Sequence, residues 1–94
     1  MLNSVGVTLN RLDRHEEACT ALEESLTLNR RTGAQQLEAH ALAALGDVNR
    51  ARGRLATARE CFELSLALRW ALRDQPGAER MRQRLADLTA SQET

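Results

Sequence analysis

The chain has 94 residues, a length that corresponds to one small domain with a modest core. Its 13 basic residues, all arginine, balance 13 acidic residues, so no bulk field selects nucleic acid or a membrane surface. Phe62 and Trp70 are the only aromatic residues, so the core must consist of Leu, Ala and Val, which pack closely in helices.

Apolar residues at three- and four-residue spacing predict five helices and no strand. Asp13 and Glu16 have the spacing of a capping box, so we expect Asp13 to cap the second helix. Asp74 followed by Pro76 indicates another capped helix start, because Pro is tolerated in the first turn. The short connections predict antiparallel hairpins, and residues 90–94 should fray. The predicted helices cover about residues 2–12, 14–31, 34–52, 55–73 and 77–89.

The third predicted helix has an apolar stripe that should be buried. Gly46 lies within this helix, where it costs about 1 kcal/mol relative to Ala, so we expect a neighbouring helix to approach closely there. Trp70, at the end of the fourth helix, is expected to cover the core against the fifth helix. The stripe consists of Leu37, Ala41, Leu42, Leu45 and Val48.

The sequence repeats with a period of 40 residues. Leu2, Gly6, Ala18, Glu23, Ser25, Leu26 and Leu28 recur as Leu42, Gly46, Ala58, Glu63, Ser65, Leu66 and Leu68. A fixed period between roughly 20 and 50 residues is typical of stacked repeat proteins, which generally present surfaces to partners. The single domain, 1–94, then divides into a first unit over about 1–33, a second over about 34–74, a closing helix over about 75–90 and a tail at 91–94.

The two units resemble tetratricopeptide repeats. The second unit carries the resemblance in Leu42, Leu45, Gly46, Ala58, Phe62 and Ser65, and the first in Leu2, Val5, Gly6, Leu9, Ala18, Leu22 and Ser25. The resemblance implies an all-α, right-handed solenoid of stacked antiparallel helical hairpins, here with five helices, that binds proteins. The chain departs from the family in its longer period, where about 34 residues is usual, and in Asn49 and Ala86, where an apolar residue and Gly are usual.

The longer period resembles a subgroup of these repeats in large bacterial regulators. That subgroup includes antibiotic-regulatory transcriptional activators and other signal-transduction ATPases, and animal polarity adaptors have similar repeats. The resemblance implies a regulatory or signalling role in a bacterium. The first predicted helix begins inside the repeat pattern, so we expect the chain to be the C-terminal fragment of a longer protein. An intact small protein that starts abruptly is the alternative.

The resemblance also implies a concave groove lined by the first helix of each unit. By position in the repeat, the candidate partner-binding residues are Asn3, Val7, Asn10, Arg11, His40, Asp47, Arg50, Arg80, Gln83 and Asp87. Such a groove offers Arg and Asn donors to a peptide or helix, with Asp47 and Asp87 to select basic groups. Chaperone-binding members hold a C-terminal carboxylate with Lys and Asn, but Val7 and Asp47 stand at two of those places, so we expect no such clamp. Alternatively, this surface touches only neighbouring parts of the parent protein.

Two further alternatives involve other surfaces. Leu2, Val5 and Leu9 have no upstream helix to cover them, so they form a candidate assembly surface for a homodimer. Arginines also gather at 50–59 and 80–84, which leaves nucleic-acid binding as a remote alternative. Acidic residues interleave there and no aromatic residue could stack on a base, so nucleic acid is an unlikely partner.

No residue pattern indicates an enzyme, a cofactor site or a metal site. His15 and His40 lack zinc-binding spacing, the glycines form no phosphate loop, and no serine lies in a nucleophile elbow. Cys19 and Cys61 form no disulfide framework and are expected to be small, semi-buried hydrophobes of a reducing compartment. Without an apolar run of about 20 residues, no membrane span is predicted, and we expect a cytoplasmic location.

Overall fold

The computed structural model describes residues 14–93, which form four α-helices and no strand. The helices are α2 (His15–Thr32), α3 (Gln35–Ala51), α4 (Leu55–Ala71) and α5 (Gln75–Glu93). These bounds confirm four of the predicted helices to within two residues at most ends. The last helix is longer than predicted and continues to Glu93, because no Gly or Pro interrupts its final turns. The predicted helix over 2–12 lies outside the described residues.

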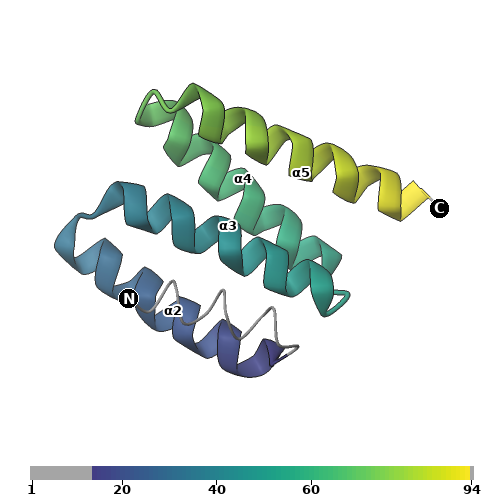
Figure 1. The fold of residues 1–94 in the computed structure, drawn as a ribbon, viewed down its shortest axis with the longest axis horizontal. Helices are drawn as coiled ribbons and strands as arrows, with labels where there is room; N and C mark the ends of the chain where they lie inside the picture. The colour runs from purple at the N-terminus through teal and green to yellow at the C-terminus, as the bar shows by residue number, and fades with distance from the viewer. Residues whose placement is uncertain (1–13, 94) are drawn as a thin grey trace.

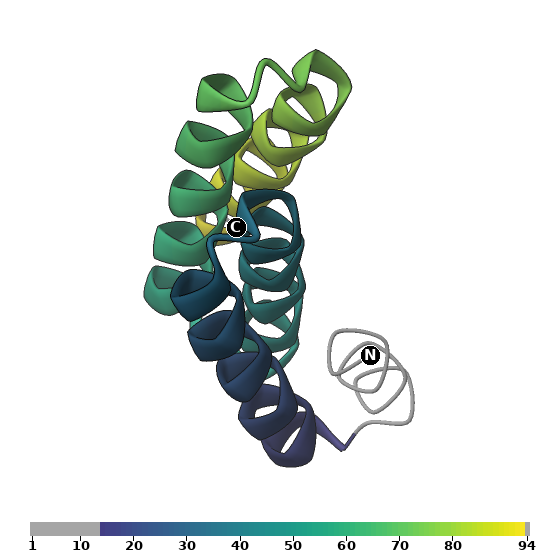
Figure 2. The ribbon, with the colours of Figure 1, turned by 90° about the vertical axis from the view of Figure 1, so that its left-hand side faces the viewer.

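Each helix packs against its neighbour in the sequence, and successive helices run in opposite directions (Figure 1). Viewed from the side, α2 and α4 form one layer and α3 and α5 form the other (Figure 2). The two helices of the second layer, α3 and α5, therefore run in the same direction. This order agrees with antiparallel hairpins and brings α3 and α5 together, although 40 residues separate their equivalent positions in the sequence.

The core consists of two clusters of small and aliphatic side chains. One lies between α2 and α3, and its buried members are Ala18, Cys19, Leu22, Ala44, Leu45 and Val48. The other joins α3, α4 and α5, and its buried members are Ala43, Ala58, Phe62, Met81 and Leu88. The predicted stripe of α3 is therefore buried except at Leu37, which is 54% exposed because it lies in the first turn, before the buried stretch of the helix begins.

Gly46 permits the closest approach between α3 and α4. A Cβ atom built on Gly46 would lie 2.6 Å from Cδ1 of Phe62, whose side chain is fully buried. Carbon atoms pack at about 3.5–4.0 Å, so any side chain at this position would push the two helices apart. The predicted close contact at Gly46 is confirmed, and it explains why the helix retains a residue of low helix propensity.

The two predicted helix caps differ in outcome. Asp74 accepts a hydrogen bond from the backbone N–H of Gly77 at 3.1 Å, which is the expected cap at the start of α5. At the start of α2 the N-cap position is occupied by Arg14, which makes no side-chain cap bond. Arg14 donates through Nε to Glu17 at 2.8 Å, and the predicted capping box, which depends on Asp13, stays a prediction. Asp13 lies outside the described residues.

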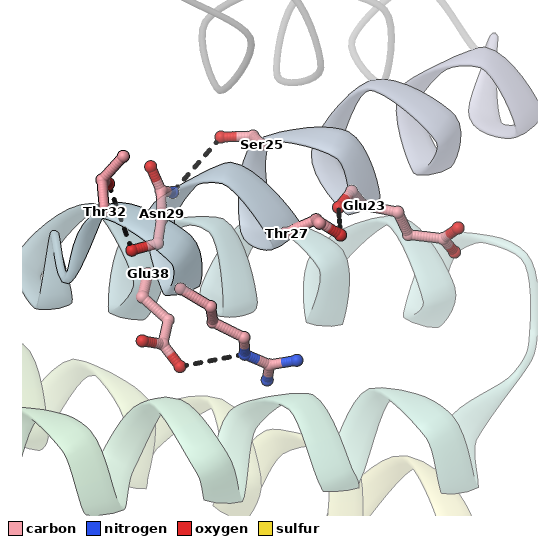
Figure 3. Close-up of polar contacts among 7 residues, drawn as sticks. Glu23, Ser25, Thr27, Asn29, Thr32 and Glu38 are labelled. Carbon is pink, nitrogen blue, oxygen red and sulfur yellow. Dashed lines mark hydrogen bonds and ion pairs between the residues drawn. The ribbon is translucent and has the colours of Figure 1, made fainter.

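One polar contact joins the end of α2 to α3, and another lies within α2 (Figure 3). Arg30 of α2 donates through Nε to Glu38 of α3 at 3.1 Å, and buried Asn29 donates to the Ser25 hydroxyl at 3.3 Å. The helix then ends at Gly33, whose left-handed φ of 72° turns the chain into α3. The same geometry recurs one repeat later at Arg73, with a φ of 58°.

Candidate functional site

A groove of about 930 Å³ lies between α3 and α5, with part of its lining contributed by α4. Half of the twelve residues that form it are charged, and three alanines of α3 lie among them. The lining residues are His40, Ala43, Ala44, Asp47, Arg50 and Ala51 from α3, Arg69 from α4, and Arg80, Met81, Gln83, Arg84 and Asp87 from α5.

The structure brings the described members of the predicted partner-binding set into this one groove. His40, Asp47, Arg50, Arg80, Gln83 and Asp87 all line it. The other four predicted residues, Asn3, Val7, Asn10 and Arg11, lie outside the described residues. The candidate assembly residues Leu2, Val5 and Leu9 also lie outside them, so both sets stay predictions.

An ion pair crosses the middle of the groove. Arg84 of α5 donates through Nε to Oδ1 of Asp47 at 2.9 Å and through Nη2 to Oδ2 at 3.3 Å. Both carboxylate oxygens of Asp47 are therefore engaged, in the two-pronged geometry that makes arginine–carboxylate pairs directional. The pair joins the two helices and sets their relative register. It also means that Asp47, expected to select basic groups, already has a cationic partner.

Arg69 is a buried arginine at the edge of the groove, only 6% exposed. Its Nε donates to the Ser65 hydroxyl at 3.1 Å, and its Nη1 lies 3.5 Å from Oδ2 of Asp74. Ser65 in turn donates to the backbone carbonyl of Ala39 at 2.8 Å, which links α4 to α3. A Cβ atom on Gly77 would lie 2.7 Å from Cγ of Asp74, so glycine is needed there for this contact.

Burial is the main influence on the Arg69 guanidinium and lowers its pKa. The nearby carboxylate of Asp74 acts in the opposite direction, whereas the positive charges of Arg80 and Arg84 lower the pKa further. Arg80 and Arg84 thus lie near enough to act on the Arg69 guanidinium. This end has an excess of positive charge.

Arg69 and Arg84 are groove residues that sequence reasoning missed. The repeat contained a signal for the first of them: Ser65 and Arg69 stand 40 positions after Ser25 and Asn29, which form the equivalent buried hydrogen bond in α2. No comparable signal exists for Arg84. Its partner is on another helix, and only the packing of α5 against α3 shows that they meet.

Trp70 does not cover the core as predicted, because its side chain is 46% exposed. The guanidinium carbon of Arg82 lies 4.8 Å from the centre of the Trp70 ring, so α5 contacts the ring through a cation–π interaction. Ser25 and Ser65 are buried and Cys61 is half-buried, as expected for small residues at packing positions. Cys19 is buried more fully than expected.

Residues 14–93 contain no helix with the length and hydropathy needed to cross a membrane. Within the same residues, no three His, Cys, Asp or Glu side chains gather closely enough to hold a metal ion.

Antiparallel helices with equivalent packing positions one repeat apart, and a groove along one layer, define an all-α helical-repeat protein. The family model for the tetratricopeptide repeat matches residues 1–69. The chain therefore belongs to the tetratricopeptide repeat family, whose members are generally non-catalytic modules for protein–protein interaction. Comparisons with curated proteins and with solved structures gave no match.

Proposed function

We propose that the chain is a protein-interaction module that binds a segment of a partner protein in the groove between α3 and α5. One observation carries this proposal. Six residues, chosen as partner-binding from their position in the repeat, line a single continuous groove. The set was taken from the family's groove by position in the repeat, and its gathering in one groove supports the repeat register that the resemblance implies.

The composition of the groove supports a peptide as the ligand. Its volume of about 930 Å³ is near the upper end of the range for ligand sites, about 300–1,000 Å³. A small-molecule site is lined mostly by hydrophobic and aromatic side chains, whereas six of the twelve residues that line this groove are charged. Ala43, Ala44 and Ala51 leave space between them, so the backbone of a bound segment can approach α3.

The wider role that we propose is regulatory. The 40-residue period resembles the repeats of bacterial antibiotic-regulatory activators and signal-transduction ATPases, and this resemblance supports a module within a larger bacterial signalling protein. Binding in the groove would then place a partner, or another domain of the same protein, next to the signalling domains.

Nucleic-acid binding is less well supported, because several of the arginines that suggested it already have partners. Arg84 pairs with Asp47, and Arg82 contacts both Glu79 and the Trp70 ring. Phosphate binding would require these contacts to break.

Selection of displayed random peptides on the immobilised chain tests the proposal without assuming any peptide charge. Peptides that bind the wild type should lose affinity when Gln83→Trp fills the groove, and should keep it when Thr27→Trp adds the same bulk to the exposed face of α2. If Gln83→Trp leaves the affinity of the selected peptides unchanged, or if no peptide is enriched, the groove is not the binding site.

A further inference from the structure

The groove carries more positive than negative charge. Four arginines line it, at positions 50, 69, 80 and 84, against two aspartates, Asp47 and Asp87. The partners of these groups within the described residues decide which of them remain available to a ligand.

Of the two acidic groups, Asp47 is paired with a cation, whereas Asp87 is bound only to a neutral amide. Asp47 accepts two hydrogen bonds from Arg84, so neither partner of this pair has its full charge available. Asp87 accepts a hydrogen bond from the Gln83 amide at 2.9 Å. Asp87 keeps its negative charge, so it is the one acidic group of the described lining that no cation compensates.

Arg50 and Arg80 are the available cations. Both side chains are exposed, and neither forms an ion pair or side-chain hydrogen bond with another residue of the described part of the chain. Arg80 also lies close enough to buried Arg69 to lower the pKa of that guanidinium, so like charges face one another at this end of the groove. Asp74 already pairs with Arg69, so a carboxylate bound there would chiefly compensate the charge of Arg80.

From these contacts we infer that the groove binds an acidic segment of a partner protein through two side-chain carboxylates, one at Arg80 beside Arg69 and the other at Arg50. This inference rests on the proposed function and specifies the chemistry of the partner. Arg80 should contribute more than Arg50, since Asp87 lies near the level of Arg50 across the groove and offsets part of its charge.

The positions of the two arginines also give the spacing of the carboxylates. Arg50 lies three residues after Asp47 on α3, and Arg80 lies four residues before Arg84 on α5. Because α3 and α5 run in the same direction and the Asp47–Arg84 pair aligns them, the backbone positions of Arg50 and Arg80 are offset by about 10 Å along the groove at 1.5 Å per residue. An extended segment covers that distance in about three residues at 3.3 Å each.

The test is fluorescence anisotropy with a synthetic, rhodamine-labelled peptide of alanine and serine that has two glutamates three positions apart and an amidated C-terminus. Amidation removes the terminal carboxylate, so binding must use the side chains. We expect saturable binding that weakens about tenfold or more with Arg80→Glu, as for loss of one charge-assisted contact, and somewhat less with Arg50→Glu. Circular dichroism of each variant checks that the helices are retained.

Arg31→Glu is the matched control. It makes the same change in net charge at an exposed site on α2 that does not line the groove, so it should change the affinity less than twofold. A peptide in which one glutamate is replaced by lysine should bind Arg80→Glu better than it binds the wild type. Because this result is a gain of affinity, it cannot arise merely because the Arg80→Glu substitution disturbs the groove.

Several results would overturn the inference. One is equal or tighter binding of a peptide in which lysine replaces both glutamates, and another is equal or tighter binding of a single-stranded oligonucleotide. The others are an equal loss of affinity with Arg31→Glu and no saturation at about 1 mM peptide. Neutral or basic peptides from the display selection that still require the groove would refute the acidic partner while leaving the proposed function intact. Selected peptides that do not require the groove would refute both.

Discussion

Replacement of Gly46 by alanine should destabilise the protein, although alanine is the better helix former. The added Cβ atom would lie 2.6 Å from Cδ1 of Phe62. Because the Phe62 ring is fully buried, it cannot swing into solvent, and α3 and α4 must separate by nearly 1 Å to restore a carbon–carbon contact of about 3.5 Å.

The magnitude follows from two opposing effects. Overpacking a core typically costs about 1–3 kcal/mol, and the whole ring is in the way here, so we take the upper value of about 3 kcal/mol. Helix propensity returns about 1 kcal/mol when Gly becomes Ala. The net loss in the free energy of unfolding is about 2 kcal/mol, which lowers the melting temperature of a domain of this size by about 10 °C.

Thermal and urea unfolding followed by circular dichroism measure this effect. Ala86→Gly is a matched control, because Ala86 stands at the equivalent position of α5 with an exposed side chain; it should lose only the propensity contribution of about 1 kcal/mol. In a Phe62→Leu background, Gly46→Ala should cost much less. A Gly46→Ala variant that is more stable than the wild type, as propensity alone predicts, would refute the close contact.

Three further predictions concern the cap at the start of α5, the turn after α4 and the Cys61 thiol. Asp74→Ala should lower the free energy of unfolding in urea by about 1 kcal/mol more than Asp74→Asn, because asparagine still caps the helix; equal losses would mean that the hydrogen bond to Gly77 contributes nothing. Arg73→Gly should stabilise the protein by about 1 kcal/mol, because Arg73 has a left-handed φ of 58° where the preceding repeat has Gly33; a lower melting temperature would contradict this. Burial raises the pKa of the Cys61 thiol, with smaller contributions from nearby acidic groups, so the unfolded thiol ionises first and stability should fall as the pH rises above about 8.5. Cys61→Ala should remove that part of the pH dependence, and unchanged dependence in the variant would assign it to another group.

The sequence contained most of the information about local structure and repeat register. The cap at Asp74 depends on residues next to one another in the chain, and the contact at Gly46 follows from one residue whose low helix propensity requires an explanation. The six groove residues of α3 and α5 came from the resemblance to tetratricopeptide repeats, and the 40-residue period gave the register by which the family's groove positions were carried over.

The contacts that the sequence did not reveal depend on distances between helices. The Asp47–Arg84 pair joins residues 37 positions apart, and no pattern within either helix indicates that they meet. Leu37 and Trp70 were expected to be buried because they are apolar, but both lie at helix ends, where little of the neighbouring helices covers them. Hydrophobicity alone does not show where the core stops.

The central claim is that the groove between α3 and α5 is the protein-binding surface. The most direct test is to follow the backbone amide signals of the ¹⁵N-labelled chain by NMR while adding the peptides enriched by display. We predict that the shifts concentrate on α3 and α5, with the largest changes near Asp47 and Arg80, and that α2 changes little. Shifts confined to α2 and the outer face of α4, with α3 and α5 unmoved, would contradict the account.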